Sequence, residues 1–435
     1  MKKLIITYTT LTILLLVACF QLKSGRFNHP YPNIIEYLAT SLLLLFTLVW
    51  IIWRKRRTQK LIVGGISMLS LFLVINLFNY LYEWHPIALK LPLSNSQSVT
   101  VNHTPYQWPK AQPATLGYDL TKWDEYFQKL KDWKRLRGLL VIQDDHIIAE
   151  KYFKGTRPTD AFNVHSITKT VTSALTGIAI DQGKINADEA PVGQFFPAYA
   201  SQFTHQQKQL KVKHLLSMRG GFAGWDGYQT VKTSLIKEGV NQQPGTFFKY
   251  YTGASNILSA IITKTTQQST KAFAQQHLFE PLGIQPAFWR KQAGYYCGGG
   301  ESYYTPRDLA RIGQLYLHQG KLNNRQIIST DWVKKSLTNY TDSSKFFRKL
   351  GDYTEVGYGY NWWILDYKDH IMYTARGKGG QYLMLLPEKN AIVVVFQEWN
   401  LQKQFKKENR LLCDLLALIY GNDQERLALK EPEKN

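Results

Sequence analysis

The sequence predicts an α/β (α+β) domain with one antiparallel sheet flanked by helices, preceded by a transmembrane helical region. Apolar runs typical of strands occur near both ends of the domain, at 138–153 and 382–399, and helical patterns lie between them. Three long apolar stretches precede the domain. With 44% hydrophobic and 14% aromatic residues, the 435-residue chain can bury a sizeable core. The expected units are a membrane region (1–84), a linker (85–115) and a folded domain (116–425).

The three apolar stretches, at 4–22, 34–53 and 61–82, are each long enough to cross a bilayer. Buried core helices are rarely so apolar on every face, so we interpret the second and third as membrane spans. The first could instead be a cleaved signal peptide, although we favour an uncleaved span. Five positive residues fill the loop at 54–60. The positive-inside rule then predicts a multi-pass cell-membrane protein whose domain after Tyr82 is extracytoplasmic.

The segment from His85 to Thr115 contains five prolines with polar residues between them. This composition is typical of an extended linker, which would hold the following domain away from the membrane.

The domain begins with an amphipathic helix at 120–133, whose apolar stripe contains Leu120, Trp123, Phe127 and Leu130. A hairpin over 138–153 follows, with its turn at Gln143, Asp144 and Asp145.

Apolar residues at roughly helical spacing predict a helix over 166–182, ended by Gly183. A mixed region of helices and loops is expected up to about His370. Strands at 382–387 and 391–399 and an amphipathic helix at about 404–419 complete the domain, so one antiparallel sheet is expected to combine both ends of the domain.

The chain is basic, with 53 lysines and arginines against 32 acidic residues and a formal charge of +21. This excess is explained either by solubility and membrane-flanking positives or by attraction to an anionic surface, such as lipid headgroups or acidic wall polymers. No zinc-knuckle, helix-turn-helix or RNP signature favours nucleic acid. Cys19, Cys297 and Cys413 form no disulfide or metal pattern, and the ten histidines are scattered. We expect no metal and no cofactor.

Ser166 and Lys169 start the helix at 166–182 and lie on the same face of it. A serine hydroxyl needs a neighbouring base to become a good nucleophile, and a desolvated lysine can act as that base. The helix N-terminus would also favour an oxyanion beside Ser166. Ser234 and Lys237 have the same spacing, but no long apolar helix follows them. We interpret that second copy as an incidental, solvated surface segment.

Two further stretches carry candidate residues. Tyr250 follows a Pro-Gly-Thr turn that would direct it into a cleft, where a phenol near an ammonium can transfer protons. Lys378, Gly379 and Gly380 stand at the expected start of a strand whose edge a substrate could approach. Taken singly, Tyr250 would be explained as a core or surface aromatic, and the Lys-Gly-Gly run would more often be a basic turn before a strand.

Together these stretches resemble the serine β-lactamase and penicillin-binding-protein superfamily, particularly its class C-related branch. Ser-Ile-Thr-Lys at 166–169 resembles the first motif of that family, Tyr-Tyr-Thr at 250–252 its Tyr-x-Asn motif, and Lys-Gly-Gly at 378–380 its Lys-Thr-Gly motif. Supporting stretches are 212–221, 244–262, 305–321 and 357–364. The resemblance covers roughly residues 120–420 and implies a β-lactamase/DD-peptidase-like fold.

The resemblance also implies roles. Ser166 would be the nucleophile, Lys169 its proton acceptor and Tyr250 the acid/base for the leaving group. Lys378 would act electrostatically near Tyr250 and a substrate carboxylate. The backbone N–H groups of Ser166 and Gln381 would form the oxyanion hole, and Thr252, Gly379 and Gly380 would contact substrate.

Two positions depart from the family pattern. Thr252 replaces the usual Asn, and Gly379 replaces the usual Thr, which removes a hydroxyl that helps to bind a β-lactam carboxylate. No Ser-Asp-Asn triplet occurs, which argues against the class A mechanism. Esterases and small-amide hydrolases of this superfamily tolerate such changes better than dedicated β-lactamases do.

We therefore expect a membrane-anchored, extracytoplasmic serine hydrolase that acts on a small ester or amide, with cell-wall D-alanyl peptides or esters among the candidates. The alternatives are an inactive wall-binding or sensor module, a true class C-like β-lactamase, and a structural membrane protein whose motifs are coincidental. The joint presence of Ser166, Lys169, Tyr250 and Lys378 argues against an inactive module, because binding alone needs none of these proton-transfer partners.

Overall fold

The computed structural model describes residues 98–224, 226–227, 229–341, 349–350, 352–398 and 405–428. They belong to the compact unit that extends from Lys90 to Asn435. The three expected membrane spans lie outside the described residues. Within the described ranges, no helix combines the length and apolar character that crossing a bilayer requires.

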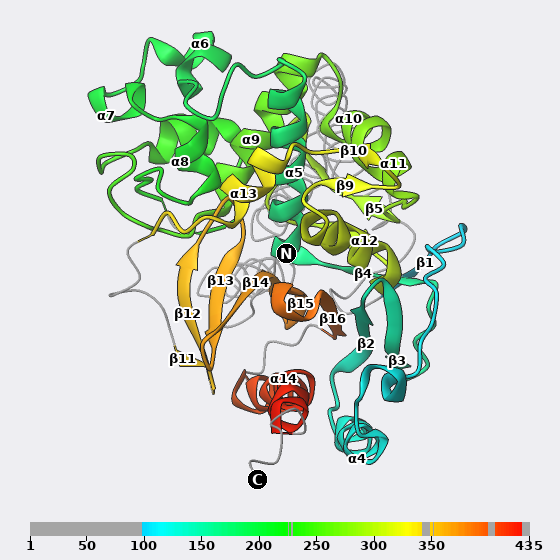
Figure 1. The fold of residues 1–435 in the computed structure, drawn as a ribbon. Helices are drawn as coiled ribbons and strands as arrows, with labels where there is room; N and C mark the ends of the chain where they lie inside the picture. Colours follow the sequence, from blue (N-terminus) through cyan, green and yellow to red (C-terminus); the bar gives the residue numbers. More distant parts are fainter. Residues whose placement is uncertain are drawn as a thin grey trace, which may run out of the picture. The chain divides into compact units, whose positions relative to one another are not determined.

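An eight-stranded antiparallel sheet forms the centre of the unit (Figure 1). Its strand order is β11-β12-β13-β14-β15-β16-β2-β3. The C-terminal strand β16 pairs with the N-terminal strand β2, with Val394 opposite Leu140. The prediction of one sheet built from both ends of the domain is therefore confirmed. The strands are β2 Leu136–Gln143, β3 His146–Tyr152, β11 Lys349–Leu350, β12 Tyr353–Tyr358, β13 Trp363–Tyr367, β14 His370–Gly377, β15 Gln381–Leu386 and β16 Ala391–Gln397.

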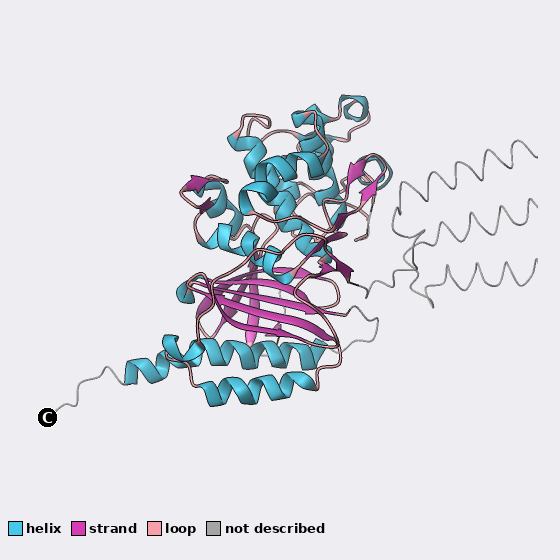
Figure 2. Ribbon diagram, turned by 90° about the vertical axis from the view of Figure 1, so that its right-hand side faces the viewer, coloured by secondary structure: helices cyan, strands magenta, loops and turns pink. Residues whose placement is uncertain are grey.

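Helices cover both faces of this sheet (Figure 2). Leu140 and Val394 share one core with residues of α5 (Thr168–Asp181) and α12 (Pro306–Leu317). The alternate residues of the same strands belong to a second core with α4 (Leu120–Lys131) and α14 (Phe405–Ala428). Because both faces are buried, the central strands are continuous apolar runs rather than alternating ones.

The expected hairpin is confirmed as β2 and β3. Asp144 and Asp145 both adopt left-handed φ angles, 47° and 61°, as a two-residue hairpin turn of the mirror-image type requires. Aspartate tolerates this conformation better than most residues. The turn chemistry therefore fixes the register of the two strands.

Helix α4 begins after Asp119, whose carboxylate accepts the Thr121 N–H at 2.8 Å. Its expected apolar stripe is partly wrong. Leu120 is 47% exposed, and Tyr126 is buried instead, with its hydroxyl donating to the Leu411 carbonyl of α14 at 3.1 Å. The helix packs against α14 as well as the sheet, so its buried face is rotated from the expected one. Helix α14 extends to Ala428, beyond the expected end at 419.

Strands β12 and β13 lie within the region that was expected to hold helices and loops up to about His370, and β14, which was not expected either, begins at its end. Their sequences are rich in tyrosine and tryptophan and interrupted by charged residues, for example Glu355 and Asp366. This pattern gives a weak period-2 signal. The aromatic rings are buried by packing against other parts of the fold, so tertiary contacts rather than local pattern define these strands.

The folded unit starts earlier than the proline-rich composition suggests. Val99 in β1 (Val99–Thr100) pairs with Ala161 in β4 (Asp160–Asn163). Trp108 is 5% exposed and donates its indole N–H to the Arg307 carbonyl at 3.2 Å. Residues 98–115 were assigned to the linker from sequence. They are instead packed on the domain, because aromatic side chains such as Trp108 are buried in its core.

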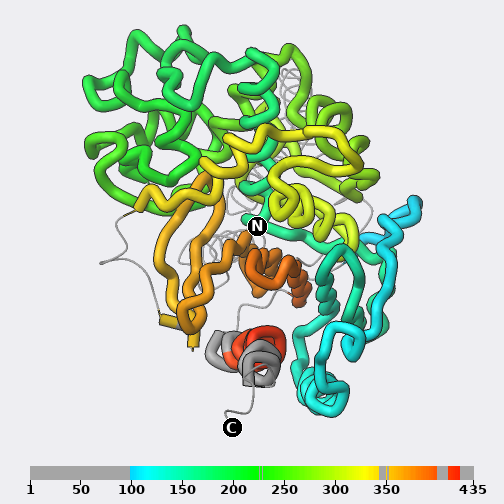
Figure 3. The backbone as a smooth tube through the Cα atoms, in the orientation of Figure 1, coloured from blue at the N-terminus to red at the C-terminus, as the bar shows by residue number. Residues whose placement is uncertain are grey.

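Between β3 and β12 the chain builds a mostly helical region, followed in Figure 3 from green to yellow. This region supplies the helices that pack on one face of the sheet. The remaining helical elements are η1 Pro113–Leu116, η2 His165–Ile167, η3 Val192–Phe195, α6 Pro197–Ala200, α7 His205–Lys208, α8 Val212–Leu216, η4 Thr233–Glu238, α9 Thr252–Thr266, α10 Thr270–Ala274, η5 Gln275–Phe279, α11 Glu280–Leu282, α13 Thr330–Leu337 and η6 Pro387–Lys389. The remaining strands are β5 Phe288–Trp289, β6 Lys291–Gln292, β7 Tyr295–Tyr296, β8 Ser302–Tyr304, β9 Lys321–Leu322 and β10 Arg325–Gln326.

Candidate active site

Ser166 lies in the 3-10 turn η2, directly before α5, rather than in the first turn of that helix as expected. The turn is held by side chains. The Asn163 carboxamide accepts the His165 N–H at 2.8 Å, and the Thr168 hydroxyl donates to the His165 carbonyl at 2.6 Å. His165 has a left-handed φ of 47°. A backbone held in this way next to a candidate nucleophile is typical of functional sites.

Lys169 is 1% exposed, and its Nζ lies within hydrogen-bond distance of three oxygens. They are Ser166 Oγ at 3.0 Å, Thr252 Oγ1 at 3.1 Å and the Gly299 carbonyl at 2.7 Å. A buried lysine needs such partners, because burial without them is costly. The structure therefore brings together Ser166, Lys169 and Thr252, which are far apart in the sequence.

Gly299 was not among the residues expected at the site. Its carbonyl reaches Lys169 because the glycine-rich loop lies tightly against α9. A Cβ on Gly298 would collide with the Ser255 carbonyl, and one on Gly299 with the Thr252 methyl group. The run of three glycines at 298–300 was the available signal, since such runs permit close backbone approach.

Tyr250 lines the same site, with its ring face toward Lys169. The Lys169 Nζ lies 4.9 Å from the ring centroid, a cation–π geometry. The ring also stacks on Trp363, with centroids 5.7 Å apart and planes at 21°. For the described part of the chain, no hydrogen bond involves the Tyr250 hydroxyl. Its neighbour Thr252 starts α9, and the Thr252 N–H donates to Asp226 Oδ1 at 2.7 Å.

Lys378, Gly379 and Gly380 form the turn between β14 and β15. They were expected at the start of a strand, and that strand, β15, begins one residue later, at Gln381. Both glycines have φ angles near +90°, 89° and 88°, which L side chains rarely adopt. A three-residue hairpin therefore explains the Gly-Gly pair. Lys378 is exposed in this turn.

The start of β15 is fixed by a pair of glutamines. Gln381 Nε2 donates to the Gln397 carbonyl at 2.7 Å, and Gln397 Nε2 donates to the Gly380 carbonyl at 2.9 Å. The end of β14 touches the turn that carries Ser166, because a Cβ on Gly377 would collide with the Val164 carbonyl. The hairpin and the nucleophile turn are therefore neighbours.

His165, which is 4% exposed, has a pKa that is shifted by burial and by the charges of the site. Burial, together with the nearby Lys378 and Lys169 charges, lowers the pKa of His165 to about 4, although Glu301 acts in the opposite direction. His165 is therefore neutral at neutral pH.

The second Ser-x-x-Lys copy is not the solvated surface segment that was expected. Ser234 is fully buried in η4, and its Oγ lies 2.8 Å from the Tyr251 hydroxyl, whereas Lys237 is exposed. The two residues therefore point into different environments. Ser234 lacks the lysine contact that distinguishes Ser166.

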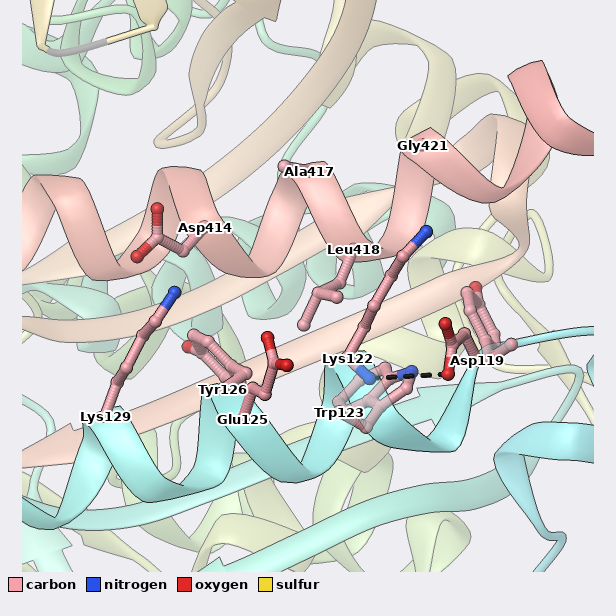
Figure 4. Close-up of a pocket in the computed structure, with 11 residues that line it drawn as sticks. Asp119, Lys122, Trp123, Glu125, Tyr126, Lys129, Asp414, Ala417, Leu418 and Gly421 are labelled. Carbon is pink, nitrogen blue, oxygen red and sulfur yellow. Dashed lines mark hydrogen bonds between the residues drawn. The ribbon is translucent and has the colours of Figure 1, made fainter.

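A cavity of about 440 Å³ between α4 and α14 lies on the other face of the sheet (Figure 4). Its walls include Trp123 and Tyr126, which belong to the second core, and Leu418, which packs against that core. It is separate from the group around Ser166, which α5 holds on the opposite face.

A half-buried serine in contact with a buried lysine, between a helical region and an antiparallel sheet, is the arrangement of serine hydrolases that work through an acyl-enzyme. The Beta-lactamase family model matches residues 123–416. The chain therefore belongs to the beta-lactamase family and is a serine hydrolase of that superfamily, as its motifs predicted. The match does not distinguish the class C-related branch, which stays a prediction.

Similar proteins include amide hydrolases. The 6-aminohexanoate-dimer hydrolase of Paenarthrobacter ureafaciens is 22% identical over 324 residues, covering 67% of this chain and 81% of that protein. A Bacillus anthracis protein provisionally named 6-aminohexanoate-dimer hydrolase has a similar fold, with a TM-score of 0.61, 17% identity, and coverage of 76% and 92% of the two chains. The D-amino acid amidase of Ochrobactrum anthropi SV3 gives a TM-score of 0.53 at 15% identity, covering 69% and 99%.

Proposed function

We propose that this enzyme hydrolyses a small amide or ester through an acyl-enzyme on Ser166. The Ser166 Oγ attacks the substrate carbonyl, and the amine or alcohol leaves with a proton. Water then attacks the acyl group, which restores the serine and releases a carboxylic acid. The observation that carries this proposal is the 3.0 Å contact between Lys169 Nζ and Ser166 Oγ.

Lys169 is the proposed base. A neutral amine has two N–H donors and one lone pair, and its surroundings offer matching partners. The Gly299 carbonyl and Thr252 hydroxyl can accept the two N–H groups, which leaves the lone pair directed at the Ser166 hydroxyl. The two accessory contacts would thus orient the amine for proton transfer.

Tyr250 is the proposed acid/base for the leaving group. Its hydroxyl makes no hydrogen bond within the described ranges, so a leaving group can occupy that position. Its ring is fixed between Lys169 and Trp363. The backbone N–H groups of Ser166 and Gln381 are the proposed oxyanion donors, and exposed Lys378 is the proposed contact for an anionic substrate group.

The substrate class follows from the two departures from the family motifs. Thr252 bonds Lys169 rather than offering an amide side chain to substrate, and Gly379 offers no hydroxyl. Similarity to a 6-aminohexanoate-dimer hydrolase and a D-amino acid amidase supports an amide with a small acyl part. We infer low activity on β-lactams, whose carboxylate loses one polar contact.

Location remains a proposal that rests on the sequence. The apolar stretches within residues 1–84 and the basic loop at 54–60 favour a membrane-anchored enzyme with an extracytoplasmic catalytic domain. In that location, D-alanyl peptides or esters of the cell wall are candidate substrates. Acidic wall polymers are candidate partners for the basic chain.

Covalent labelling with a fluorophosphonate tests the nucleophile. Ser166→Ala should abolish labelling and turnover, whereas Ser234→Ala should leave labelling intact. Labelling that survives the first change and is lost with the second would show that the motif is wrongly assigned. A wild-type enzyme that binds wall fragments but neither labels nor turns over any substrate would favour an inactive module.

Steady-state turnover of a p-nitrophenyl ester, a small p-nitroanilide and a chromogenic cephalosporin tests the substrate class. We expect the ester and the anilide to be hydrolysed and the cephalosporin slowly or not at all. One lost polar contact costs about 1–3 kcal/mol, or roughly one to two decades in rate. Cephalosporin turnover as fast as that of the ester would restore the β-lactamase alternative.

A further inference from the structure

Tyr251 stands between two residues of the active site but faces away from it. Its backbone is extended, with φ −146° and ψ 108°. Successive side chains of an extended segment point to opposite sides. Tyr250 and Thr252 both reach Lys169, and Tyr251 is directed into the protein, where it is 1% exposed.

The Tyr251 side chain is held by η4 and by the loop before it. Its hydroxyl donates to the Glu238 carboxylate and lies 2.8 Å from Ser234 Oγ. Its ring stacks on Phe222, with centroids 4.5 Å apart and planes at 22°. Glu238 also accepts from Gln229 Nε2 at 3.3 Å. The Tyr251 side chain therefore connects η4, the loop residues Phe222 and Gln229, and the start of α9.

Glycines make room for this arrangement. A Cβ on Gly224 would overlap the Glu238 carboxylate, and a Cβ on Gly253 would collide with Ser234 Oγ and the Tyr251 ring. The phenol stays a neutral donor, because burial and the adjacent Glu238 carboxylate raise the pKa of Tyr251 well above its ordinary value. A charged acceptor makes its hydrogen bond a strong one.

We propose that Tyr251, anchored by Glu238, is a positioning residue that sets the direction of Tyr250 and Thr252 toward Lys169. The inference rests on the proposed function, because it assumes that Ser166 and Lys169 carry the reaction. It also gives the second Ser-x-x-Lys copy a role. Ser234 is part of the anchor and not a second nucleophile, since it is buried and contacts a phenol instead of a lysine.

The position of the extended segment 250–252 matters because two of its side chains contact Lys169. Thr252 supplies one of three oxygens around Lys169 Nζ, and Tyr250 supplies the ring over it. A shift of the extended segment would move both together. Misplacement of catalytic groups by about 1 Å can lower a rate roughly a hundredfold.

The test compares Tyr251→Phe with Tyr126→Phe. Tyr126 is also buried and also donates from its hydroxyl, to Leu411, but it lies in the α4–α14 layer across the sheet. Active Ser166 is counted by fluorophosphonate titration of the full-length enzyme. Ester turnover per titrated site is then measured over pH, together with thermal stability.

Tyr251→Phe should lower kcat per titrated site by roughly 10- to 100-fold, with little change in KM, and should shift the midpoint of the pH profile. Tyr126→Phe should lower thermal stability while keeping the turnover and pH profile of the wild type. Tyr251→Phe with wild-type turnover and pH profile would overturn the proposal and leave Tyr251 a purely structural residue.

A second pair keeps the test decisive if Tyr251→Phe does not fold. Glu238→Gln retains an acceptor for the phenol, whereas Glu238→Ala removes it. Turnover per titrated site should therefore be higher in Glu238→Gln than in Glu238→Ala, and equal values would overturn the proposal. Absence of labelling in the wild type would instead contradict the Ser166 mechanism, and the inference would fall with it.

Discussion

Thr252, which departs from the family motif, contacts the proposed catalytic base Lys169. Thr252 cannot offer the amide of an asparagine, but its hydroxyl lies 3.1 Å from Lys169 Nζ and completes the set of three oxygens around it. The Thr252 hydroxyl is therefore a hydrogen-bond partner of Lys169, and its expected contact with substrate stays a prediction.

Thr252→Val tests this at nearly constant shape. It removes the hydroxyl, and losing a hydrogen bond to a charged or strongly polar group costs about 1.5–3 kcal/mol. We expect kcat/KM for an ester to fall roughly 10- to 100-fold. Thr252→Ser keeps the hydroxyl and should stay close to wild type. Similar losses in both variants would indicate that the methyl group, which touches Gly299, matters more.

His165 makes stability depend on pH. Its pKa is about 4 in the folded chain and 6.5 in its unperturbed form. Between these values the unfolded chain binds the extra proton, so stability is full above pH 6.5 and falls as the pH is lowered toward 4. The contribution over that window is about 3 kcal/mol.

His165→Asn should flatten this dependence, because asparagine accepts the left-handed backbone and does not titrate. Denaturant unfolding at pH 6.5 and pH 4.5 measures the difference for both proteins. His214, whose pKa is also lowered to about 4, chiefly by burial, contributes equally to each. The same loss of stability in wild type and variant would exclude His165 as its source.

At the scale of elements, the β14–β15 hairpin and the η2–α5 junction form the two sides of the site. Gly377 lets the hairpin approach the Val164 carbonyl, and the Gln381–Gln397 pair holds the first residue of β15. The turn glycines make this approach possible without strain.

Gly380→Ala should therefore reduce both stability and activity. The alanine would have to adopt a φ of 88° and its Cβ would collide with the Gln397 amide, at a cost of about 1–3 kcal/mol. Gly183→Ala is the matched control, because Gly183 also has a positive φ of 67° but an open surrounding. It should cost about 1 kcal/mol and keep full activity per titrated site. Equal activity in the two variants would argue against Gln381 as an oxyanion donor.

At the scale of the whole molecule, the sheet separates two cores. One packs α5 and α12 and carries the Ser166 site, and the other packs α4 and α14. The β2–β16 pairing connects the two ends of the domain, so the central sheet needs residues from both. The site therefore depends on long-range contacts rather than on any one segment.

The predicted membrane topology belongs to this scale. A reporter fused after residue 90 should be active only when it is an extracytoplasmic reporter, because the positive-inside rule predicts that the loop at 54–60 stays in the cytoplasm. Fusions of an alkaline phosphatase and of a cytoplasmic reporter at the same position measure this. Activity of the cytoplasmic fusion would reverse the assigned orientation.

Local patterns in the sequence were sufficient to predict several features of the fold. The Asp-Asp turn required a hairpin, the apolar runs at 382–399 required buried strands, and the spacing of Ser166 and Lys169 required a shared face. Ordered motifs also identified the family. The turn, the strands and the shared helix face need only neighbouring residues, and each family motif is itself a short local stretch, so a single sequence is enough to recognise them.

The features that long-range packing controls became clear only from the folded structure. It showed that β12–β14 are strands, that Trp108 belongs to the core, and that Gly299 completes the Lys169 environment. It also placed Ser234 against Tyr251. Each of these features depends on a contact with residues distant in the sequence. The type of a residue does not indicate which distant group will bury its side chain, form a hydrogen bond with it or limit its size.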